Sequence, residues 1–272
     1  MKVSVVIPAY NEQRYLGACL ESLLGQTVPA AEIIVVDNNS TDRTAQVARR
    51  FPNVRVLREP KQGIVYARNR GFNAASGDII ARIDADTRVP PHWITQLHSL
   101  FQSPDISGVT GPPSFCDTAW SRLMSSFYKL IVFDFHRHLL HHHILWGSNC
   151  AIKKDAWASV HTSVCNSSAV HEDLDLAIHL TRQGGEISYE PNLVVDASLR
   201  RLHQANGFGV YLGQWYQTLA IHGCRTYGLD KLVGYSALFT RPLVSRFLKM
   251  ARAFAHHRII ADLFLGQSRF VQ

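Results

Sequence analysis

The amino-acid sequence predicts an α/β fold built on a mostly parallel, doubly wound sheet. Short apolar runs, typical of buried strands, recur through the first 84 residues. Segments with apolar residues at helical spacing separate these runs, and turn residues mark the junctions. A regular alternation of strand and helix gives a parallel sheet with helices on its faces.

The first predicted unit is a strand, a helix and a second strand. Residues 3–7 are nearly continuous apolar sequence, as in a strand covered on both faces, and Pro8 ends the run. The next apolar run, residues 33–36, ends at Asp37. Leucines at helical spacing indicate the helix between them: Leu16, Leu20, Leu23 and Leu24. A right-handed crossover is expected.

The same alternation continues to residue 84. A polar helix over about 41–50, capped by Ser40 or Thr41, precedes a strand at 54–57. A helix over 63–75 then leads to a strand at 79–83. The later expected elements are a helix from 92 to 102, a strand at 106–110, an aromatic and histidine-rich helix at 120–143, a strand and helix start in 147–157, a helix from 171 to 183, and strands at 187–189 and 193–195.

Two carboxylates, Asp84 and Asp86, directly follow the strand at 79–83. The carboxyl ends of strands form the ligand-binding edge of an open α/β sheet, so the pair is delivered to that edge. Alternate residues of an extended segment point the same way, so both carboxylates can converge on one hard cation that also binds a phosphate. An Asp-x-Asp alone also occurs in solvated turns.

Amide and acidic side chains follow the other strands, among them Asn11, Glu12, Asp37 and Asn38. Such an edge suits a nucleobase and a metal-neutralised pyrophosphate, whereas it repels a bare phosphate. The first strand is followed by PAYNEQRYLG, so the glycine fingerprint of a dinucleotide fold is absent, and there is no phosphate-binding P-loop.

Two further polar clusters have an ordinary structural explanation. Glu172 and Asp173 open a helix, where acidic residues commonly stabilise the amino-terminal end. The segment from His136 to His143 places His138 and His142 four residues apart, a spacing that can chelate a transition metal. No carboxylate or cysteine at ligand spacing supports that site, which favours a partly exposed helix face.

Composition and charge restrict the protein's class. The chain has 272 residues with 46% apolar residues, enough for a sizeable core. The initial apolar run is too short for a signal peptide, and no stretch reaches the ~18 apolar residues of a membrane span. Five scattered cysteines fit buried thiols in a reducing compartment, so we expect a cytoplasmic protein. The net charge is +7, and residues 241–272 carry six basic residues against one acidic (6 − 1 = +5), which argues against a nucleic-acid groove through the molecule.

Taken together, these motifs resemble the family 2 glycosyltransferases of the GT-A fold. The resemblance covers about residues 3–203 and keeps the family's order and spacing. The matching segments are SVVIPAYNE at 4–12, IIVVDNNSTDRT at 33–44, GIVYARNRGFNAASGDIIARIDADT at 63–87, GSNCAIKKDAW at 147–157, and Glu172-Asp173 ahead of DLAIHLTRQG.

The resemblance implies a role for each site residue. Asp84 and Asp86 look like the family's metal-binding motif, with Asp86 the more direct ligand of Mn²⁺ or Mg²⁺ bridging the donor's phosphates. Asp173 looks like the general base. The residues implied for nucleotide-sugar binding are Pro8, Ala9, Tyr10, Glu12, Asp37, Asn38, Arg68, Asp84, Ala85 and Arg201. Many relatives carry a second acid at the place of Asn38, so uracil and guanine both remain open.

The chemistry explains these residue types. Breaking the bond between sugar and phosphate leaves charge on a nucleoside diphosphate, which a divalent cation stabilises. A carboxylate within reach of the acceptor hydroxyl takes its proton as it attacks. One carboxylate base and direct attack invert the anomeric carbon.

The carboxyl-terminal part lies outside the clear resemblance. We expect residues 1–203 to form the catalytic domain and 204–272 a helical extension. The Gln-x-x-Arg-Trp motif of processive relatives is missing around Gly213-Gln214-Trp215, which indicates transfer of a single sugar to an acceptor not identified by sequence. Residues 241–258 predict a basic amphipathic helix, which can lie on an anionic membrane surface or dock on the protein's own core.

Two alternatives remain open from sequence. A sugar nucleotidyltransferase shares the α/β layout, but its glycine-rich basic loop after the first strand is missing here. A nucleotide-binding or adaptor module could keep the fold without catalysis. Intact Asp84, Asp86 and Asp173 count against that second alternative.

Overall fold

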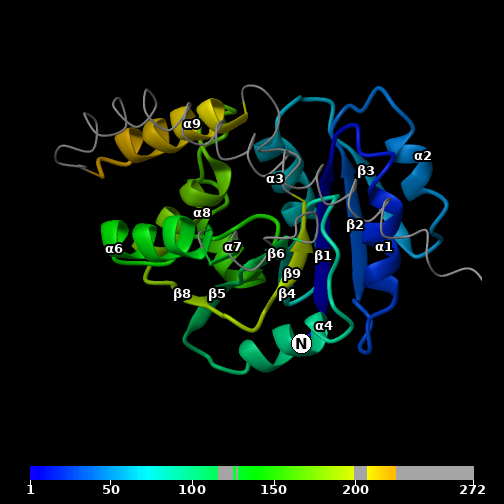
Figure 1. Ribbon diagram of the computed structural model, residues 1–272, viewed down its shortest axis with the longest axis horizontal. Helices are drawn as coiled ribbons and strands as arrows, with labels where there is room; N and C mark the ends of the chain where they lie inside the picture. Colours follow the sequence, from blue (N-terminus) through cyan, green and yellow to red (C-terminus); the bar gives the residue numbers. More distant parts are fainter. Residues whose placement is uncertain (116–124, 127, 199–206, 225–272) are drawn as a thin grey trace, which may run out of the picture.

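The computed structural model describes residues 1–115, 125–126, 128–198 and 207–224 (Figure 1). Its centre is a seven-stranded sheet in the order β3-β2-β1-β4-β7-β5-β8. The strands are β1 (Val3–Ala9), β2 (Glu32–Asp37), β3 (Val54–Arg58), β4 (Ile79–Arg82), β5 (Ile106–Thr110), β7 (Cys150–Lys153) and β8 (Glu186–Tyr189). β7 runs antiparallel to β4 and β5, and the other pairs are parallel, which confirms the predicted fold class.

A second sheet of two strands stands beside the first. β6 (Pro113–Phe115) pairs in parallel with β9 (Val195–Ala197). An antiparallel bridge between Arg88 and Asp196 connects this small sheet to the segment that follows the acidic pair. The segment after Asp86 is therefore held by backbone pairing.

Helices cover both faces of the large sheet, as continuously apolar strands require. Side chains alternate along β1, so Val5 and Ile7 pack in one core cluster and Val6 in another. The helices of the first cluster are α1 (Leu16–Leu24), α2 (Thr44–Ala48) and α4 (Trp93–Leu100). Those of the second are α3 (Ile64–Ala74), α7 (Lys154–Val160) and α8 (Glu172–Arg182).

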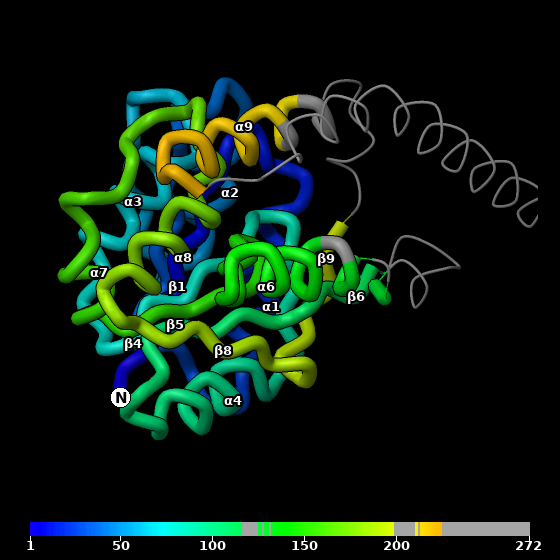
Figure 2. Tube along the Cα trace, turned by 90° about the vertical axis from the view of Figure 1, so that its left-hand side faces the viewer, coloured from blue at the N-terminus to red at the C-terminus, as the bar shows by residue number. Residues whose placement is uncertain are grey.

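Helix α8 is covered on a further side by the segments around α9. Its Leu174 and Ile178 pack with Phe133 and Leu219. Phe133 comes from the π-helix η1 (Lys129–Asp134), which continues into α6 (Phe135–Leu140), and Leu219 comes from α9 (Gly207–Ile221). Figure 2 shows α9 beside α8. The described part of the predicted extension thus packs on the core, while the division at residue 203 stays a prediction.

Three sequence predictions need correction. The polar helix spans only Thr44–Ala48, its N-cap position is Arg43, and no side chain caps it, so neither Ser40 nor Thr41 is the cap. Just ahead of this helix, Oδ1 of Asp42 accepts from the Thr44 amide at 2.8 Å. The described part of 120–143 does not form one α-helix, because it changes from η1 to α6 and ends at left-handed His141. The last strand starts at Val195, because Leu193 closes a turn onto the carbonyl of Glu190.

The predicted amphipathic helix at 241–258 lies outside the described residues. Among the residues that the structure does describe, none of the helices has the length and apolar character needed to cross a membrane.

Candidate active site

The predicted donor residues gather at the carboxyl edge of three neighbouring strands. Ala9 of β1 is in register with Asp37 of β2, and the Asn38 amide donates to the carbonyl of Ala9 at 2.8 Å. Asp84 and Asp86 follow β4, the other neighbour of β1. The side chains of Pro8, Ala9 and Ala85 are buried, so these residues could contact a ligand at this edge only through their backbone.

The loop after β1 is fastened to the loop after β2. Asn11 takes a left-handed backbone, and its Oδ1 accepts from the Thr41 amide at 2.8 Å. The amide of Glu12 donates to Oγ1 of Thr44 at 2.7 Å. This arrangement buries the Glu12 side chain and leaves Tyr10 47% exposed. An exposed ring beside a fixed loop can stack on a base.

Asn38 has a structural task in the protein. Its Nδ2 donates to the carbonyls of Glu59 and Lys61, and its Oδ1 accepts from the amide of Gly63 at 2.8 Å. The side chain thereby joins β2 to the loop ahead of α3. Its contact with a nucleotide stays a prediction.

Arg68 lies inside the second core cluster. Its guanidinium is 0% exposed, packs over the rings of Phe72 and Trp157, and donates to the carbonyl of Glu172 at 3.3 Å. Burial lowers the pKa of Arg68, which nearby Glu172 and Asp173 partly oppose. A nucleotide would reach this group only after a rearrangement, and the contact of Arg68 with a nucleotide stays a prediction.

A buried arginine that sequence reasoning missed joins the acidic groups. Arg82, the last residue of β4, is 2% exposed. Its Nη2 lies 3.5 Å from Oδ1 of Asp84 and 3.1 Å from Oε1 of Glu172, and its Nη1 donates to Oδ1 of Asp173. Burial opposes its charge, yet these three carboxylates raise the pKa of Arg82 above its ordinary value. The guanidinium of Arg82 therefore joins β4 to α8.

Asp173 is held by both of its oxygens. Oδ1 accepts from Arg82, and Oδ2 accepts from the amide of Gly147 at 2.9 Å. Burial raises the pKa of Asp173 to about 6 in spite of the opposing Arg82 charge. Burial also acts on Glu172, but Arg82 and other neighbouring cations outweigh it and lower the pKa of that carboxyl. A carboxylate with a pKa near 6 suits a general base close to neutral pH.

Gly147 and Ser148, just ahead of β7, complete this geometry. A Cβ on Gly147 would collide with the Arg82 guanidinium and with Oδ2 of Asp173. Ser148 Oγ donates to Oδ2 of Asp84 at 2.6 Å. Glycine is therefore required at position 147, next to Asp173, and the hydroxyl of the following residue binds Asp84.

The match to the family model named "Glycosyl transferase family 2" covers residues 4–159, more than half of the chain. The chain belongs to glycosyl transferase family 2. This confirms the resemblance that the motifs indicated.

Curated relatives of this family 2 chain match mainly over its first part. The uncharacterized glycosyltransferase YibD of Escherichia coli is 38% identical over 109 residues, 39% of this chain and 32% of that protein. Glycosyltransferase GlyG of Streptococcus pneumoniae is 39% identical over 114 residues, 40% of this chain and 38% of that protein. The chain thus spans about a third of the length of these relatives.

Solved structures support the GT-A fold of this family 2 chain. A mannosyltransferase from Pyrobaculum calidifontis, in complex with GDP-Man and Mn²⁺, has a TM-score of 0.62 at 18% identity, covering 96% of this chain and 80% of that one. Glucosyl-3-phosphoglycerate synthase from Mycobacterium tuberculosis, in complex with Mn²⁺, UDP and phosphoglyceric acid, has a TM-score of 0.63 at 23% identity, covering 84% and 80%.

The acidic pair of this family 2 chain fits a hard divalent cation. The Asp86 carboxylate is half-buried at the end of β4, while Asp84 is engaged by Ser148 and Arg82. Carboxylate oxygens are the donors that Mg²⁺ and Mn²⁺ prefer. The assignment of Asp86 as the more direct ligand stays a prediction.

Several predicted residues are not brought into this site. Arg201 lies outside the described residues. In the histidine-rich segment, His136 is buried and accepts from Nε1 of Trp215, and Nδ1 of His142 bonds to the carbonyl of His143 at 2.9 Å. Because α6 ends at Leu140, His138 and His142 do not share one helix. The pair at i, i+4 therefore loses its geometric basis.

Sequence reasoning overlooked Arg82, Gly147 and Ser148, although all three lie in motifs that the resemblance used. The available signal for Arg82 was a charge inside a run of otherwise apolar residues, IIARI. A buried charge requires a partner, so that position itself predicted an ion pair.

Proposed function

We propose that this protein is an inverting, metal-dependent glycosyltransferase that moves one sugar from a UDP- or GDP-linked donor to an acceptor hydroxyl. The observation that carries the proposal is that Arg82 contacts both Asp84, at the donor edge, and Asp173, the candidate base. One guanidinium spans the two groups, so the donor side and the base side of the reaction lie next to each other. A nucleotide-binding module without catalysis does not need a buried base at this place.

The protein's own residues supply most of the proposed chemistry. Asp173 accepts the proton of the acceptor hydroxyl, because burial gives it a pKa near the working pH. Arg82 and the Gly147 amide hold its carboxylate in one orientation. Tyr10, Glu12 and Asp37 bind the nucleoside at the edge of β1 and β2. Asp86, with Asp84, would hold Mn²⁺ or Mg²⁺, which would supply positive charge to stabilise the leaving diphosphate.

The donor stays open between UDP and GDP sugars. Support for both comes from the neighbours, since one was solved with GDP-Man and another with UDP. Asn38 has an amide instead of a carboxylate, and the structure bonds this amide to the backbone of Glu59, Lys61 and Gly63. Asp37 is then the acid that reads the base.

The experiment that tests this function is nucleotide binding followed by turnover. Thermal shifts with UDP, GDP and their sugars, each with and without Mn²⁺, identify the donor. EDTA should abolish binding by wild type, and Asp86→Ala should weaken it at least about tenfold, because the diphosphate loses its counter-charge. Asp105→Ala, an acid outside the site, is the control. Equal, EDTA-insensitive binding by Asp86→Ala would remove the metal assignment.

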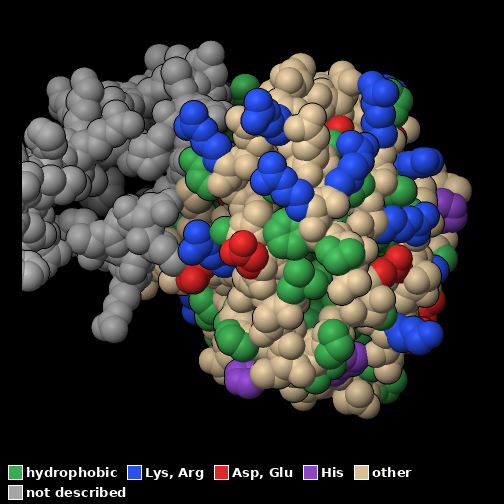
Figure 3. Space-filling model, turned by 90° about the vertical axis from the view of Figure 1, so that its right-hand side faces the viewer, with side chains coloured by type: hydrophobic (Ala, Val, Ile, Leu, Met, Phe, Trp, Pro, Cys, Tyr) green, Lys and Arg blue, Asp and Glu red, His purple; other side chains and the backbone are tan. Residues whose placement is uncertain are grey.

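We also propose a cytoplasmic protein with peripheral contact to anionic membranes through residues 241–258, which supply basic side chains. The face over α1 and α2 carries scattered Lys and Arg mixed with acidic side chains instead of a continuous basic strip (Figure 3). Co-sedimentation with anionic vesicles at low salt tests the contact, and failure to pellet would favour docking on the core.

A further inference from the structure

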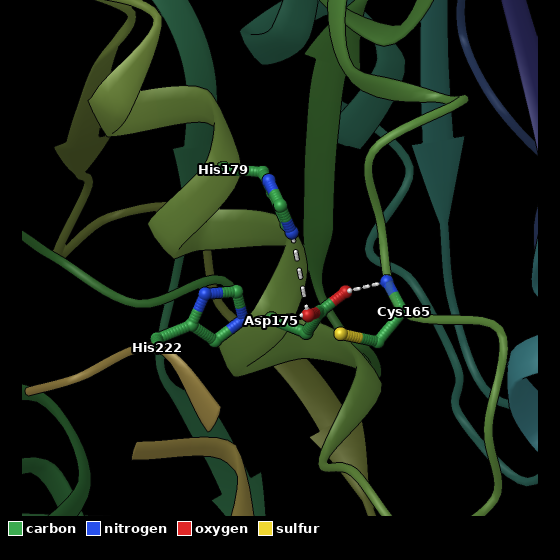
Figure 4. A group of neighbouring side chains, drawn as sticks. All are labelled: Cys165, Asp175, His179 and His222. Atoms are coloured by element: carbon green, nitrogen blue, oxygen red, sulfur yellow. Dashed lines mark hydrogen bonds and ion pairs between the residues drawn. The ribbon is translucent and has the colours of Figure 1, made fainter. Parts of the chain in front are cut away.

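Four potential metal ligands meet beside α8, away from the donor edge. Cys165 comes from the loop between α7 and α8, Asp175 and His179 from α8, and His222 from the residue after α9. Their ligand atoms all lie within 4.8 Å of one another. Figure 4 shows the sulfur of Cys165 and both imidazole rings turned toward the Asp175 carboxylate.

We propose that Cys165, Asp175, His179 and His222 bind one zinc(II) ion that fastens the end of α9 and the α7–α8 loop to α8. One thiolate, one carboxylate and two imidazoles form a donor set that zinc favours. Four protein ligands close the coordination sphere, which is the pattern of structural rather than catalytic zinc.

The distances in the cluster suit this ion. A tetrahedral zinc with bonds of about 2.0–2.3 Å separates its ligand atoms by about 3.3–3.8 Å. Nε2 of His179 lies 3.6 Å from Oδ1 of Asp175, and Nε2 of His222 lies 2.8 Å from the same oxygen. The two imidazoles meet at 82° with ring centroids 4.8 Å apart. Shifts of less than about 1.5 Å would bring the four atoms to tetrahedral spacing.

An unsatisfied nitrogen points to a ligand independently of the cluster's composition. Nε2 of His179 is buried and has no hydrogen-bond partner, since 3.6 Å to Asp175 is too long for such a bond. The Asp175 side chain is 0% exposed and accepts from the Cys165 amide at 2.9 Å. A buried carboxylate facing an orphaned imidazole nitrogen gains from a cation between them.

One neighbour opposes the ion. Nη1 of Arg182 lies 3.2 Å from Nδ1 of His222, and Nη2 donates to the carbonyl of the same residue. A metal at Nε2 requires the ring proton on Nδ1, where it would face the guanidinium. Arg182 must therefore turn Nη1 away while Nη2 keeps the carbonyl. Arg182→Gln offers an acceptor to that proton, so it should bind zinc more tightly than wild type.

This site is separate from the candidate active site although both use α8. Residues two apart on a helix point about 200° away from each other, so Asp173 faces Arg82 while Asp175 faces α9. The ion would stiffen the helix that carries the candidate base. No step of sugar transfer depends on it.

The test uses the full chain, stripped with a chelator under a thiol-free reductant and reloaded with Zn²⁺ or Co²⁺. We expect one tightly held metal per chain, a sulfur-to-cobalt charge-transfer band and intense visible bands of tetrahedral cobalt. Cobalt bound by the carboxylate oxygens of Asp84 and Asp86 would give neither of these two spectroscopic signals. Asp86→Asn should therefore keep both the charge-transfer band and the tetrahedral cobalt bands.

Matched variants assign the signals to residues. Cys165→Ser should lose the charge-transfer band and bind zinc at least about tenfold more weakly, whereas Cys224→Ser, a thiol two residues from His222, should match wild type. Zinc should raise the melting temperature of wild type and of Cys224→Ser, but not of His222→Gln. Should His222→Gln fail to fold, Cys165→Ser carries the test, since Cys165 lies in a partly exposed loop.

Three results would overturn the site. The first is a cobalt spectrum without the thiolate band, and the second is a band that survives Cys165→Ser. The third is a loss of stability in His222→Gln that is the same with zinc and with chelator. In that last case the four side chains form only a hydrogen-bonded cluster.

Discussion

The guanidinium of Arg82 donates to Oδ1 of Asp173 and thereby ties the end of β4 to the first turn of α8. The two residues are 91 positions apart in the chain. Removing one partner of a buried ion pair is costly because the other charge stays buried without compensation. The stability of the fold and the state of the candidate base are therefore linked through one contact.

Arg82→Gln should lower the free energy of unfolding by ~3–5 kcal/mol near neutral pH, the cost of leaving buried carboxylates unpaired. The loss should shrink at about pH 5, because Asp173 and Glu172 can then take up protons and become neutral. Urea denaturation at both pH values measures this. Arg55→Gln is the control, since its side chain is 53% exposed in a pair with Glu32 and should cost at most ~1 kcal/mol. A pH-independent loss in Arg82→Gln would contradict the pairing.

Asp173→Asn should reduce turnover by ~10²-fold or more, because the acceptor hydroxyl loses its base. The variant should also melt earlier than wild type, since the amide nitrogen faces either Arg82 or the Gly147 amide and cannot accept from them. Nucleotide affinity should persist. Turnover, melting temperature and nucleotide affinity are measured together.

Glu172→Gln is the matched variant for Asp173→Asn, because it removes another carboxylate from the same guanidinium, 3.1 Å away. We expect a similar drop in melting temperature but the smaller loss of rate. If both variants lose rate in proportion to stability, Asp173 is a structural acid and the base lies elsewhere.

The pH dependence of turnover should report the same carboxylate. With a pKa of about 6 in the folded protein, Asp173 is a carboxylate above that pH and a neutral acid below it. The rate should therefore be flat above about pH 7 and fall ~10-fold per unit well below pH 6. A steady-state profile at saturating donor, checked for folding by circular dichroism, measures this. A rate that stays flat to about pH 4.5 would mean that no group with this raised pKa acts as base.

Gly147→Ala should destabilise the protein by ~1–3 kcal/mol, because the added methyl group overlaps the Arg82 guanidinium and Oδ2 of Asp173. Turnover should fall as well, since the base is displaced. Gly213→Ala in α9 is the control: its added Cβ meets nothing within 4 Å, and alanine in a helix gains ~0.5–1 kcal/mol over glycine. Chemical denaturation measures the free energy of unfolding of both variants, and a turnover assay compares their rates with that of wild type.

Much of the fold could be predicted because its causes are local. The nearly continuous apolar runs at 3–7 and 33–36 predict strands that are buried on both faces of the sheet. The helical periodicity between these runs predicts a helix that crosses over from one strand to the next, so the two strands are parallel. Element ends were not encoded in the periodicity, because the start of α2 beside Asp42 and the left-handed turn at His141 depend on single residues.

The sequence by itself determined the mostly parallel sheet, the acidic pair after β4 and the family, because apolar periodicity, the alternation of strands and helices, and spaced motifs are properties of the linear chain. Only the tertiary structure decided what those motifs contact. Burial of Arg82 joined Asp84 to Asp173, packing removed Arg68 from the surface, and folding of α9 onto α8 brought His222 to Cys165 and Asp175. The physical reason is that ion pairs and ligand clusters are set by distance in space, and residues from separate elements meet only when the core places their helices and strands.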